Sequence, residues 1–346
     1  MRFEVDYDRA PLLVIWEVTR ACALACRHCR AAAEDLRHPR ELTLDEGKNL
    51  LDQVRAMGTP LMIFTGGDPL QRDDLEDLVR HAKAIGLRPA AIPAATPRLT
   101  RERMFSLKEA GIDQVAISLD ASTAQRHDDF RKVEGTFAKA MQGIEWAHEA
   151  GIPLQINTVF GSWNVDDFDA MAALVQRLNI VFWEVFFLVP TGRGAELQGC
   201  TPDQMKELFR KLYDLSLTAP FVVKLTEAQH FRCYAARRTA EMPPGTRPRL
   251  MMSGRPVNAG CGFCFVDHIG NICPSGFLPL ERGNIRTHRL ADVYRDDPVF
   301  RELRDAGKLK GRCVDCGDRD MCSGGSRARA YALTGDYLAP DPLCIF

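Results

Sequence analysis

The sequence predicts an α/β protein, a partial (β/α)6 TIM-like barrel followed by a small cysteine-rich extension. Three observations support this fold class. Short runs of β-branched and aromatic residues alternate with amphipathic stretches of helical length from residue 12 to about residue 217. The boundaries between them repeat, as in KEAGID and HEAGIP, where a helix ends at glycine and a strand follows. Seven of the twelve cysteines lie in the last quarter of the chain.

Six strand candidates alternate with helix candidates in the barrel region. The first helix candidate is LTLDEGKNLLDQVRAMG (42–58), in which leucines and a valine recur at helical spacing and Gly58 is the expected end. Six such units in succession favour a parallel sheet with helices outside it. The strand candidates are LLVIWEV (12–18), LMIF (61–64), LRPAAI (87–92), IDQVAISL (112–119), IPLQINTV (152–159) and VFWEVFFLV (181–189).

The chain divides into four segments. Residues 1–11 form a lead-in, and residues 12–220 form the barrel. Residues 221–260 contain RRTAEMPPGTRPRL and SGRPVNAG, which are rich in Pro, Gly and Arg and indicate a long connection. Residues 261–346 have too little apolar periodicity for a core of their own, so we expect their cysteines to supply the missing stability.

The composition excludes several classes of partner. A net charge of −1 gives no excess of basic groups for nucleic acid or an anionic membrane. No run reaches the roughly 18 apolar residues that a membrane span needs. We therefore expect a cytoplasmic protein with a small or local partner, no nucleic acid and no membrane. In that compartment, clustered cysteines bind metal more often than they form disulfides.

The first cysteine group, CALACRHC (22–29), directly follows the first strand candidate. The loops after barrel strands carry the active site. Cys22, Cys26 and Cys29 suit three corners of a [4Fe-4S] cluster and leave the fourth iron open. A structural zinc site would instead use four protein ligands. The alternatives are a zinc site that lacks one ligand, or three packed thiols.

This spacing resembles the signature of the radical S-adenosylmethionine (SAM) family. In that family the open iron chelates the amino and carboxylate groups of SAM. The resemblance implies one-electron reduction of SAM to methionine and a 5'-deoxyadenosyl radical, which abstracts hydrogen from a substrate. It also implies an oxidoreductase or lyase that needs a low-potential electron donor such as flavodoxin or ferredoxin.

The stretch FTGGDP (64–69) resembles the Gly-Gly-Glu-Pro of the same family. Two glycines let the backbone come close to a bound amino-acid group. Asp68 keeps the carboxylate but shortens its reach, so we assign the SAM ammonium mainly to backbone carbonyls around Gly66 and Gly67. The alternative is an ordinary turn.

Polar residues at later strands match the family as well. Ser118 and Asp120 lie two positions apart, on one face of an extended chain, and resemble contacts to the SAM ribose and carboxylate. Arg131 is a candidate partner of that carboxylate, the alternative being a solvated arginine. The same resemblance assigns the ribose and adenine to Asn157, Thr158 and Val189.

The last four cysteines follow a specific spacing. Cys313-x2-Cys316-x5-Cys322, followed by 21 residues and Cys344, resembles the SPASM or twitch-like extension that holds auxiliary clusters. Four thiolates also suit zinc, which stabilises small folds. Iron is favoured because the chain already requires iron–sulfur assembly. We therefore expect at least one auxiliary [4Fe-4S] cluster.

A second auxiliary cluster would lack ligands. In the full SPASM pattern cysteines stand where this chain has Ser275 and Ser326, and both belong to the same cluster. We therefore do not expect that cluster to be fully ligated. Cys200 and Cys233 are expected to be unligated thiols. The remaining candidates for a rearranged metal site are Cys261, Cys264 and Cys273.

The substrate class follows from the wider resemblance. WEVTRACALACRHCRA, LQINTVF and FFLVPTGRG look most like radical SAM/SPASM proteins that modify tetrapyrroles. About eleven residues precede the first strand, too few for the peptide-recognition domain that some peptide-modifying members carry. We expect oxidative or decarboxylation-type chemistry on a tetrapyrrole or another small molecule. The alternatives are a peptide maturase with a separate recognition protein, and a non-catalytic iron–sulfur sensor, which would not need the Gly66-Gly67 turn.

Overall fold

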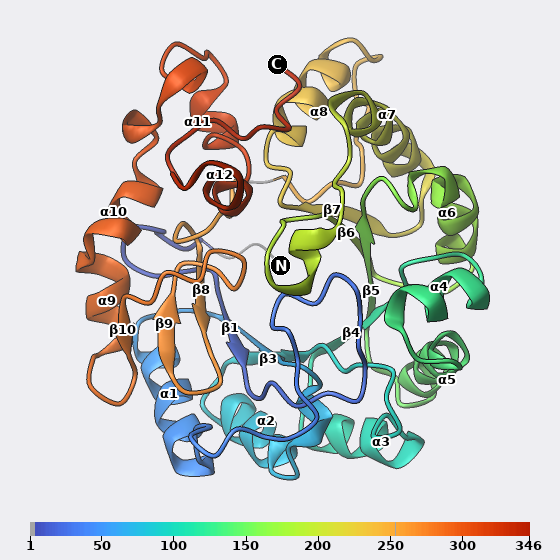
Figure 1. Cartoon of the computed structure of the whole chain (residues 1–346), viewed down its shortest axis with the longest axis vertical. Helices are drawn as coiled ribbons and strands as arrows, with labels where there is room; N and C mark the ends of the chain where they lie inside the picture. The colour runs from blue at the N-terminus through green and yellow to red at the C-terminus, as the bar shows by residue number, and fades with distance from the viewer. Residues whose placement is uncertain (1–3, 253) are drawn as a thin grey trace.

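The structure is a computed structural model that describes residues 4–252 and 254–346. Residues 1–3 of the expected lead-in and residue 253 of the expected connection lie outside the described residues. The strands form one ten-stranded sheet in the order β10-β9-β8-β1-β2-β3-β4-β5-β6-β7. Figure 1 shows the sheet curving around the centre of the molecule with the helices outside it.

Seven parallel strands form the barrel part of the sheet. Each pairs with the next along the chain, starting with Leu13 opposite Leu61. The predicted α/β partial barrel is therefore confirmed, with each of the six predicted strands present. The seven strands are β1 (Leu13–Glu17), β2 (Leu61–Thr65), β3 (Arg88–Ala91), β4 (Gln114–Ser118), β5 (Leu154–Phe160), β6 (Phe182–Phe187) and β7 (Val222–Thr226).

The first helix shows why the sequence forms these elements. α1 (Leu44–Ala56) begins with a capping box between Thr43 and Glu46, which satisfies backbone N–H groups at the helix start. It ends before Gly58, which has a φ of +90°. The other helices of the barrel are α2 (Leu75–Ala84), α3 (Arg101–Glu109), α4 (Ala124–Arg131), α5 (Thr136–Glu149), α6 (Phe168–Gln176) and α7 (Pro202–Thr218).

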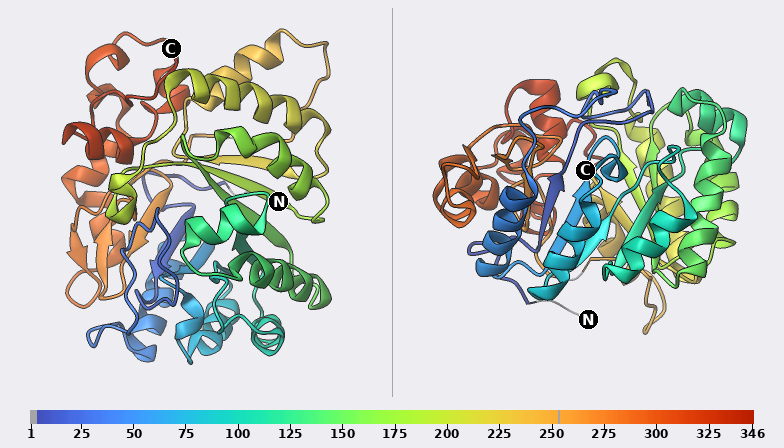
Figure 2. Two further views of the ribbon diagram at one scale, coloured as in Figure 1. Left: turned by 45° about the vertical axis from the view of Figure 1, so that its right-hand side comes forward. Right: turned by 90° about the horizontal axis from the view of Figure 1, so that it is seen from below.

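The main core lies between the sheet and these helices. Val14 and Trp16 on β1, like Met62 and Phe64 on β2, are completely buried. Their alternation places the intervening side chains on the inner face of the barrel. Figure 2 shows the helices covering the outer face of the sheet from two further directions.

The expected connection, residues 221–260, contains two regular elements. β7 extends the sheet beyond β6, and α8 (Phe231–Ala240) follows it. Residues near 250 then cover the outer edge of β7, where the N–H of Val223 donates to the Arg249 carbonyl at 2.8 Å. The N–H of Met251 returns to the Val223 carbonyl at 3.2 Å. An otherwise exposed sheet edge is thereby paired.

The cysteine-rich segment is hydrogen-bonded into the barrel sheet. β8 (Phe263–Val266) pairs in parallel with β1, and β9 (Asn271–Cys273) and β10 (Gly283–Asn284) follow in antiparallel pairs. Figure 1 shows this segment in orange and red beside β1. Its helices are α9 (Leu290–Asp296), α10 (Pro298–Arg304), α11 (Arg319–Cys322) and α12 (Arg327–Thr334). No helix among the described residues has the length and apolar character needed to cross a membrane.

The buried side chain of Arg329 on α12 contacts the barrel near the ends of β6 and β7. The Arg329 guanidinium donates to the carbonyls of Leu188 at 3.1 Å and of Glu227 at 2.6 Å, beyond the ends of β6 and β7. It also pairs with the Asp341 carboxylate at 2.9 Å. The extension therefore contacts both the β1 edge and the β7 side of the barrel.

Ser326 has a structural role at this contact. Its Oγ accepts from the N–H of Arg329 at 2.9 Å, as the N-cap of α12, and donates to the Glu227 carboxylate at 2.5 Å. Its own N–H donates to Asp341 at 2.8 Å. The position at which the full SPASM pattern has a cysteine is thus part of a buried polar network.

Candidate functional site

The loop after β1 carries the three cysteines of the first group. Cys22 and Cys26 are buried, Cys29 is half-buried, and all three thiols are free. The N–H of Leu24 donates to the Cys22 sulfur and the N–H of Ala33 to the Cys29 sulfur, each at 3.4 Å. Burial raises the pKa of Cys22 to about 12, so metal binding there must displace a proton.

Gly66 and Gly67, which follow β2, pack closely against the backbone of this loop. A Cβ atom at Gly66 would lie 2.5 Å from the Thr19 carbonyl oxygen, and one at Gly67 would lie 2.4 Å from the Arg20 carbonyl oxygen. The N–H of Gly67 donates to the Thr19 carbonyl at 2.8 Å. Both positions therefore require glycine because the cysteine loop itself approaches them closely.

Asp68 is directed into the protein and stabilises the neighbouring loop. Its carboxylate accepts from the hydroxyl of Thr96 at 2.6 Å and from the N–H groups of Leu70 at 3.1 Å and Ala94 at 3.3 Å. Burial raises the pKa of Asp68. Because Asp68 holds the loop after β3, the backbone around Gly66 and Gly67 is left as the polar surface beside the cysteines.

A buried ion pair links the end of β4 to the cysteine loop. The Arg131 guanidinium contacts the Asp120 carboxylate at 2.5 Å and the Cys26 sulfur at 3.5 Å. Asp120 also accepts from the N–H of Val159 at 2.9 Å. Although burial opposes ionisation, the charge of Arg131 holds the pKa of Asp120 below its usual range. Two of the predicted polar residues thus meet at the cysteine loop.

The other predicted contacts lie further along the strands. Ser118 and Asn157 are register partners on β4 and β5, on the inner face. Thr158 is turned to the core, where its hydroxyl accepts from the indole of Trp183 at 2.9 Å. Val189 is buried in a small apolar cluster with Ala259 of the connecting segment and with Leu278, Leu303 and Ala328 of the extension. The contact of Val189 with the SAM adenine stays a prediction.

Arg193, which follows β6 in the FFLVPTGRG stretch, also contacts the cysteine loop, although the resemblance does not name it as a site residue. Its backbone N–H donates to the Cys29 carbonyl at 3.0 Å, and its side chain donates to the carbonyls of Cys26 at 3.0 Å and Ala33 at 3.2 Å. The preceding Gly192 has a φ of +54°, and a Cβ there would lie 2.3 Å from the Arg30 carbonyl oxygen. The FFLVPTGRG stretch marks this segment in the sequence, but the contact itself joins residues far apart in the chain and forms only on folding.

These residues fit a [4Fe-4S] cluster and its cofactor. Among residues 4–252 and 254–346, no three His, Cys, Asp or Glu side chains are grouped to hold one metal ion. A [4Fe-4S] cluster does not need such a group, because each thiolate binds a different iron. Arg131 Nε and Arg193 Nη2 are buried without a hydrogen-bond partner in the described part of the chain. Donors of this kind beside N–H groups aimed at sulfur suit a negatively charged group.

The four cysteines of the extension lie near one another. Burial raises the pKa of Cys313, and Cys322, Cys344 and Cys316 are all close enough to raise it further. A fifth thiol, Cys233 on α8, adjoins this group, and its sulfur lies 4.0 Å from the carbonyl oxygen of Asp318, between Cys316 and Cys322. This contact cannot be read from the spacing of the four, because Cys233 belongs to another element.

The other three cysteines of the extension lie on and before the strands that join the barrel. Cys264 on β8 is part of the main core, and its sulfur lies 3.8 Å from the Cys273 carbonyl oxygen. Cys273 is the register partner of Phe265. Burial raises the pKa of Cys261 to about 11. Ser275 makes a local turn, in which its Oγ accepts from the N–H of Phe277 at 3.1 Å.

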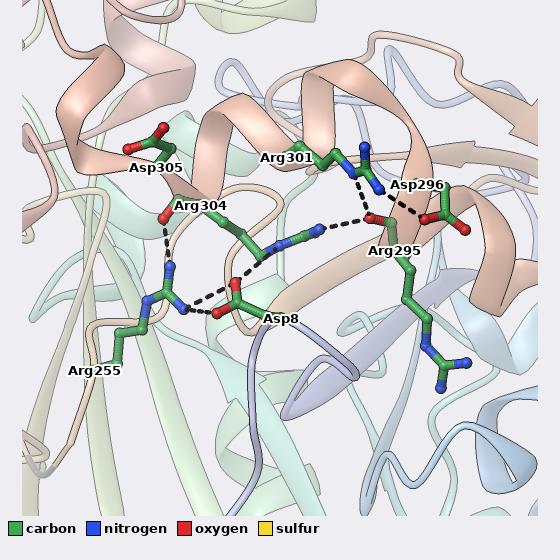
Figure 3. A pocket seen from close by; sticks show the side chains of 7 residues that line it. All are labelled: Asp8, Arg255, Arg295, Asp296, Arg301, Arg304 and Asp305. Atoms are coloured by element: carbon green, nitrogen blue, oxygen red, sulfur yellow. Dashed lines mark hydrogen bonds and ion pairs between the residues drawn. The ribbon is translucent and has the colours of Figure 1, made fainter.

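A separate pocket of about 550 Å³ lies between the lead-in and the extension. Figure 3 shows Asp8 between Arg255 and Arg304, with contacts of 3.2 and 3.3 Å. None of its lining residues comes from the carboxyl ends of the barrel strands, so the pocket is distinct from the cysteine-loop site. The residues that line it are Asp8, Arg255, Arg295, Asp296, Arg301, Arg304 and Asp305.

Comparisons with known proteins agree on one family. A family model of the radical SAM superfamily matches residues 16–175. The chain is 39% identical to the AdoMet-dependent heme synthase of Oleidesulfovibrio alaskensis, with 99% of this chain and 89% of the relative covered. It is 37% identical to the AdoMet-dependent heme synthase of Methanosarcina barkeri, with 99% and 98% covered.

The fold has known counterparts as well. The crystal structure of Streptococcus suis SuiB bound to S-adenosylmethionine matches with a TM-score of 0.77 at 16% identity. The match covers 98% of this chain and 78% of SuiB. At this level of identity the likeness concerns the fold alone.

Proposed function

The chain belongs to the radical SAM superfamily, and from that membership we propose that it is an AdoMet-dependent heme synthase acting on an iron tetrapyrrole. The observation that carries the proposal is the cysteine loop, whose three thiols lie at the carboxyl end of β1 among N–H and guanidinium donors. The relatives of that name match over almost the whole chain, so the support extends to the barrel and the extension together.

Cys22, Cys26 and Cys29 are the proposed ligands of the first cluster. When bound, this cluster and SAM supply one-electron cleavage of SAM and a group that takes a hydrogen atom from the substrate. Arg131 Nε, buried without a partner among the described residues, is the donor available to the SAM carboxylate. Asp120 orients Arg131, and the backbone around Gly66 and Gly67 offers carbonyls to the SAM ammonium.

The proposed reaction converts propionate side chains to the vinyl groups of heme. Loss of a hydrogen atom from the propionate carbon next to the ring leaves a substrate radical. Cleavage of the bond to the carboxylate then forms the vinyl double bond, releases CO2 and frees one electron. That electron needs an acceptor, and the electron that starts the reaction needs a low-potential donor of the ferredoxin or flavodoxin class.

An assay with purified, anaerobically reconstituted protein tests this function. With SAM, dithionite and Fe-coproporphyrin III, which has propionates at the vinyl positions, we expect heme and 5'-deoxyadenosine to form together. The variant Cys22→Ala/Cys26→Ala/Cys29→Ala should form neither product while it keeps iron in the extension. Deoxyadenosine formation by this variant would reject the ligand assignment. SAM cleavage with a precursor peptide but not with the porphyrin would favour the peptide maturase, and no SAM cleavage at all would favour the sensor.

The proposal includes one auxiliary [4Fe-4S] cluster on Cys313, Cys316, Cys322 and Cys344. The mutual proximity of these four thiols supports it. Together with the first cluster it implies about eight irons per chain. Nearer twelve would mean that Cys261, Cys264 and Cys273 hold a further cluster, and zinc in the extension would mean that the auxiliary site is structural only.

A further inference from the structure

The inner face of the sheet carries an apolar row where the extension joins the barrel. On β1, Trp16 belongs to the core outside the sheet, so Ile15 faces inward. On β8, Cys264 belongs to the same core, so Phe265 faces inward. Ile15 is the register partner of both Phe265 and Ile63 on β2. Ile15 and Ile63 are only half-buried, so part of this apolar row stays accessible inside the barrel.

Arg30, which directly follows the last cysteine of the first group, lies beside this row. Its guanidinium carbon lies 4.7 Å from the centre of the Phe265 ring. Its Nη2 donates at 2.7 Å to the carboxylate of Glu17, which lies two positions after Ile15 and faces the same side. A Cβ at Gly276 would lie 3.1 Å from the guanidinium carbon, so the turn after β9 also approaches it closely. Contacts with three separate segments therefore fix the Arg30 side chain on the inner face.

The charges around Arg30 do not cancel. Glu17 is completely buried and pairs with two guanidiniums, that of Arg30 at 2.7 Å and that of Arg20 at 3.1 Å. Although burial opposes ionisation, the charge of Arg30 lowers the pKa of Glu17 to about 2, so this carboxylate is ionised at neutral pH. His268, 3.2 Å from Glu17, carries no negative charge in either protonation state. No other carboxylate in the described part of the chain pairs with either arginine, so one positive charge is left without a partner.

The Arg30 guanidinium also keeps donors for a further acceptor. Among the described residues, its only hydrogen bond is the one from Nη2 to Glu17. The side chain is 18% exposed, so Nε and Nη1 are available to a ligand inside the barrel. A guanidinium that is held on one side and open on the other suits bidentate binding of a carboxylate.

We propose that Arg30 is a substrate-binding residue: its guanidinium binds a propionate carboxylate of the tetrapyrrole, whose ring lies over Ile15 and Ile63. This inference rests on the proposed function and names the part of the same site that holds the substrate. A tetrapyrrole of this class is a flat apolar ring with carboxylates at its edge, which matches an apolar row beside an uncompensated cation. Because Arg30 is adjacent to Cys29 in the chain, this contact holds the ring next to the proposed first cluster.

Binding of the porphyrin can be measured without turnover. The reconstituted full-length protein, with SAM but without a reductant, is titrated with Fe-coproporphyrin III, and the change in Soret absorption gives the Kd. Arg30→Met should raise this Kd about tenfold or more, because a charge-assisted contact is lost. The tetramethyl ester of the same porphyrin has no carboxylate, so its Kd should be the same for the wild type and for Arg30→Met.

Arg101→Met is the matched control. Arg101 on α3 also pairs with a carboxylate, that of Glu149 at 2.7 Å, and its guanidinium carbon lies 4.4 Å from the centre of the Phe105 ring, but α3 lies outside the sheet. Its replacement should leave both Kd values unchanged. Arg30→Lys keeps a charge opposite Glu17 and replaces Arg30→Met if that variant does not fold. It lacks the planar guanidinium, so we expect its Kd for Fe-coproporphyrin III to rise about threefold.

The possible outcomes separate this inference from the proposed function. An unchanged Kd for Fe-coproporphyrin III in a folded Arg30→Met would overturn the inference and leave the proposed function intact. An equal loss of affinity for the ester would mean that Arg30 shapes the site and does not bind the carboxylate. Loss of iron from Arg30→Met would make Arg30 part of the cluster site instead. If the wild type does not bind Fe-coproporphyrin III, the proposed substrate is wrong, and the inference fails with it.

Discussion

At the scale of single residues, the Asp120–Arg131 pair joins the barrel to the cysteine loop. Asp120 is 2% exposed and Arg131 is 8% exposed. Each charge is desolvated, so each depends on the other for its stability in the interior. The pair also places a guanidinium against Cys26, which connects fold stability to the site.

Asp120→Asn should destabilise the protein because it leaves the Arg131 charge buried without its carboxylate. We expect a loss of about 3 kcal/mol in the free energy of unfolding, measured by urea denaturation. Asp77→Asn is the control, since Asp77 and its partner Arg80 are more than half exposed and such pairs contribute about 0.5 kcal/mol. Equal losses in the two variants would contradict the role of the buried pair.

His230 is a second residue whose burial has a measurable consequence. It is completely buried, packs against the ring of Phe209 at 5.0 Å between centroids, and lies 3.9 Å from the Asp341 carboxylate. Burial lowers the pKa of His230 to about 4; Asp341 opposes this shift, and Arg329 and Arg312 add to it. The folded protein therefore keeps His230 neutral at a pH where the unfolded chain would protonate it.

The stability of the protein should fall as the pH is lowered from 6.5 to 4, because the unfolded state binds the extra proton. His230 alone accounts for about 2 kcal/mol of this loss by pH 5. In His230→Phe this part of the pH dependence should disappear. Urea denaturation at pH 7 and pH 5 measures it, and an unaltered difference between the two pH values would show that His230 is not the group responsible.

At the scale of elements, the backbone of the cysteine loop packs directly on Gly66 and Gly67, where a side chain would displace it. Gly67→Ala should push the carbonyls of Arg20 and Ala21 away, since the new Cβ would lie 2.4 and 2.5 Å from them. We expect loss of iron from the first cluster and of SAM cleavage, with the helical circular dichroism unchanged. Gly199→Ala is the control, because nothing lies within 4 Å of its Cβ position. Normal SAM cleavage by Gly67→Ala would contradict this account.

The sequence predicts the six barrel strands because each is an apolar run bounded by local stop signals. The helices between them are bounded in the same way, as α1 is by Thr43 and Gly58. The sequence does not separate β7 and α8 from the surrounding Pro- and Arg-rich stretch. β7 is stabilised by pairing with β6 and by Arg249 and Met251, which are long-range contacts. The segment therefore has no local periodicity that would identify it.

The same reasoning applies to the site. Close spacing marks Cys22, Cys26 and Cys29, and the double glycine marks the turn after β2. Thr96 and Arg193 reach the cysteine-loop site, and Cys233 reaches the cysteines of the extension, from distant parts of the chain, and their contacts exist only after folding. The sequence shows that Ser326 replaces a cysteine of the SPASM pattern. It does not show that Ser326 is an N-cap, because this role is known only once the start of α12 is known.

At the scale of the whole molecule, Arg329 connects the extension to the barrel. Arg329→Met should leave the Asp341 carboxylate buried without its ion pair, at a loss of about 3–5 kcal/mol. We expect residues 313–346 to become sensitive to protease before the barrel does. Arg301→Met is the control, because Arg301 and Asp296 form an exposed pair, 64% and 67% exposed. Equal protease sensitivity in the two variants would argue against Arg329 as the fastening contact.

The pairing of β1 with β8 also affects how the chain is made on the ribosome. Leu13 pairs with Phe263, so one edge of β1 has no partner until three quarters of the chain has been synthesised. At typical translation rates this interval lasts roughly 10–50 s. An unpaired strand edge is prone to aggregation during that time. Synonymous codons that slow translation just before residue 263 should therefore lower the yield of folded protein, whereas the same codons placed after residue 300 should leave it unchanged.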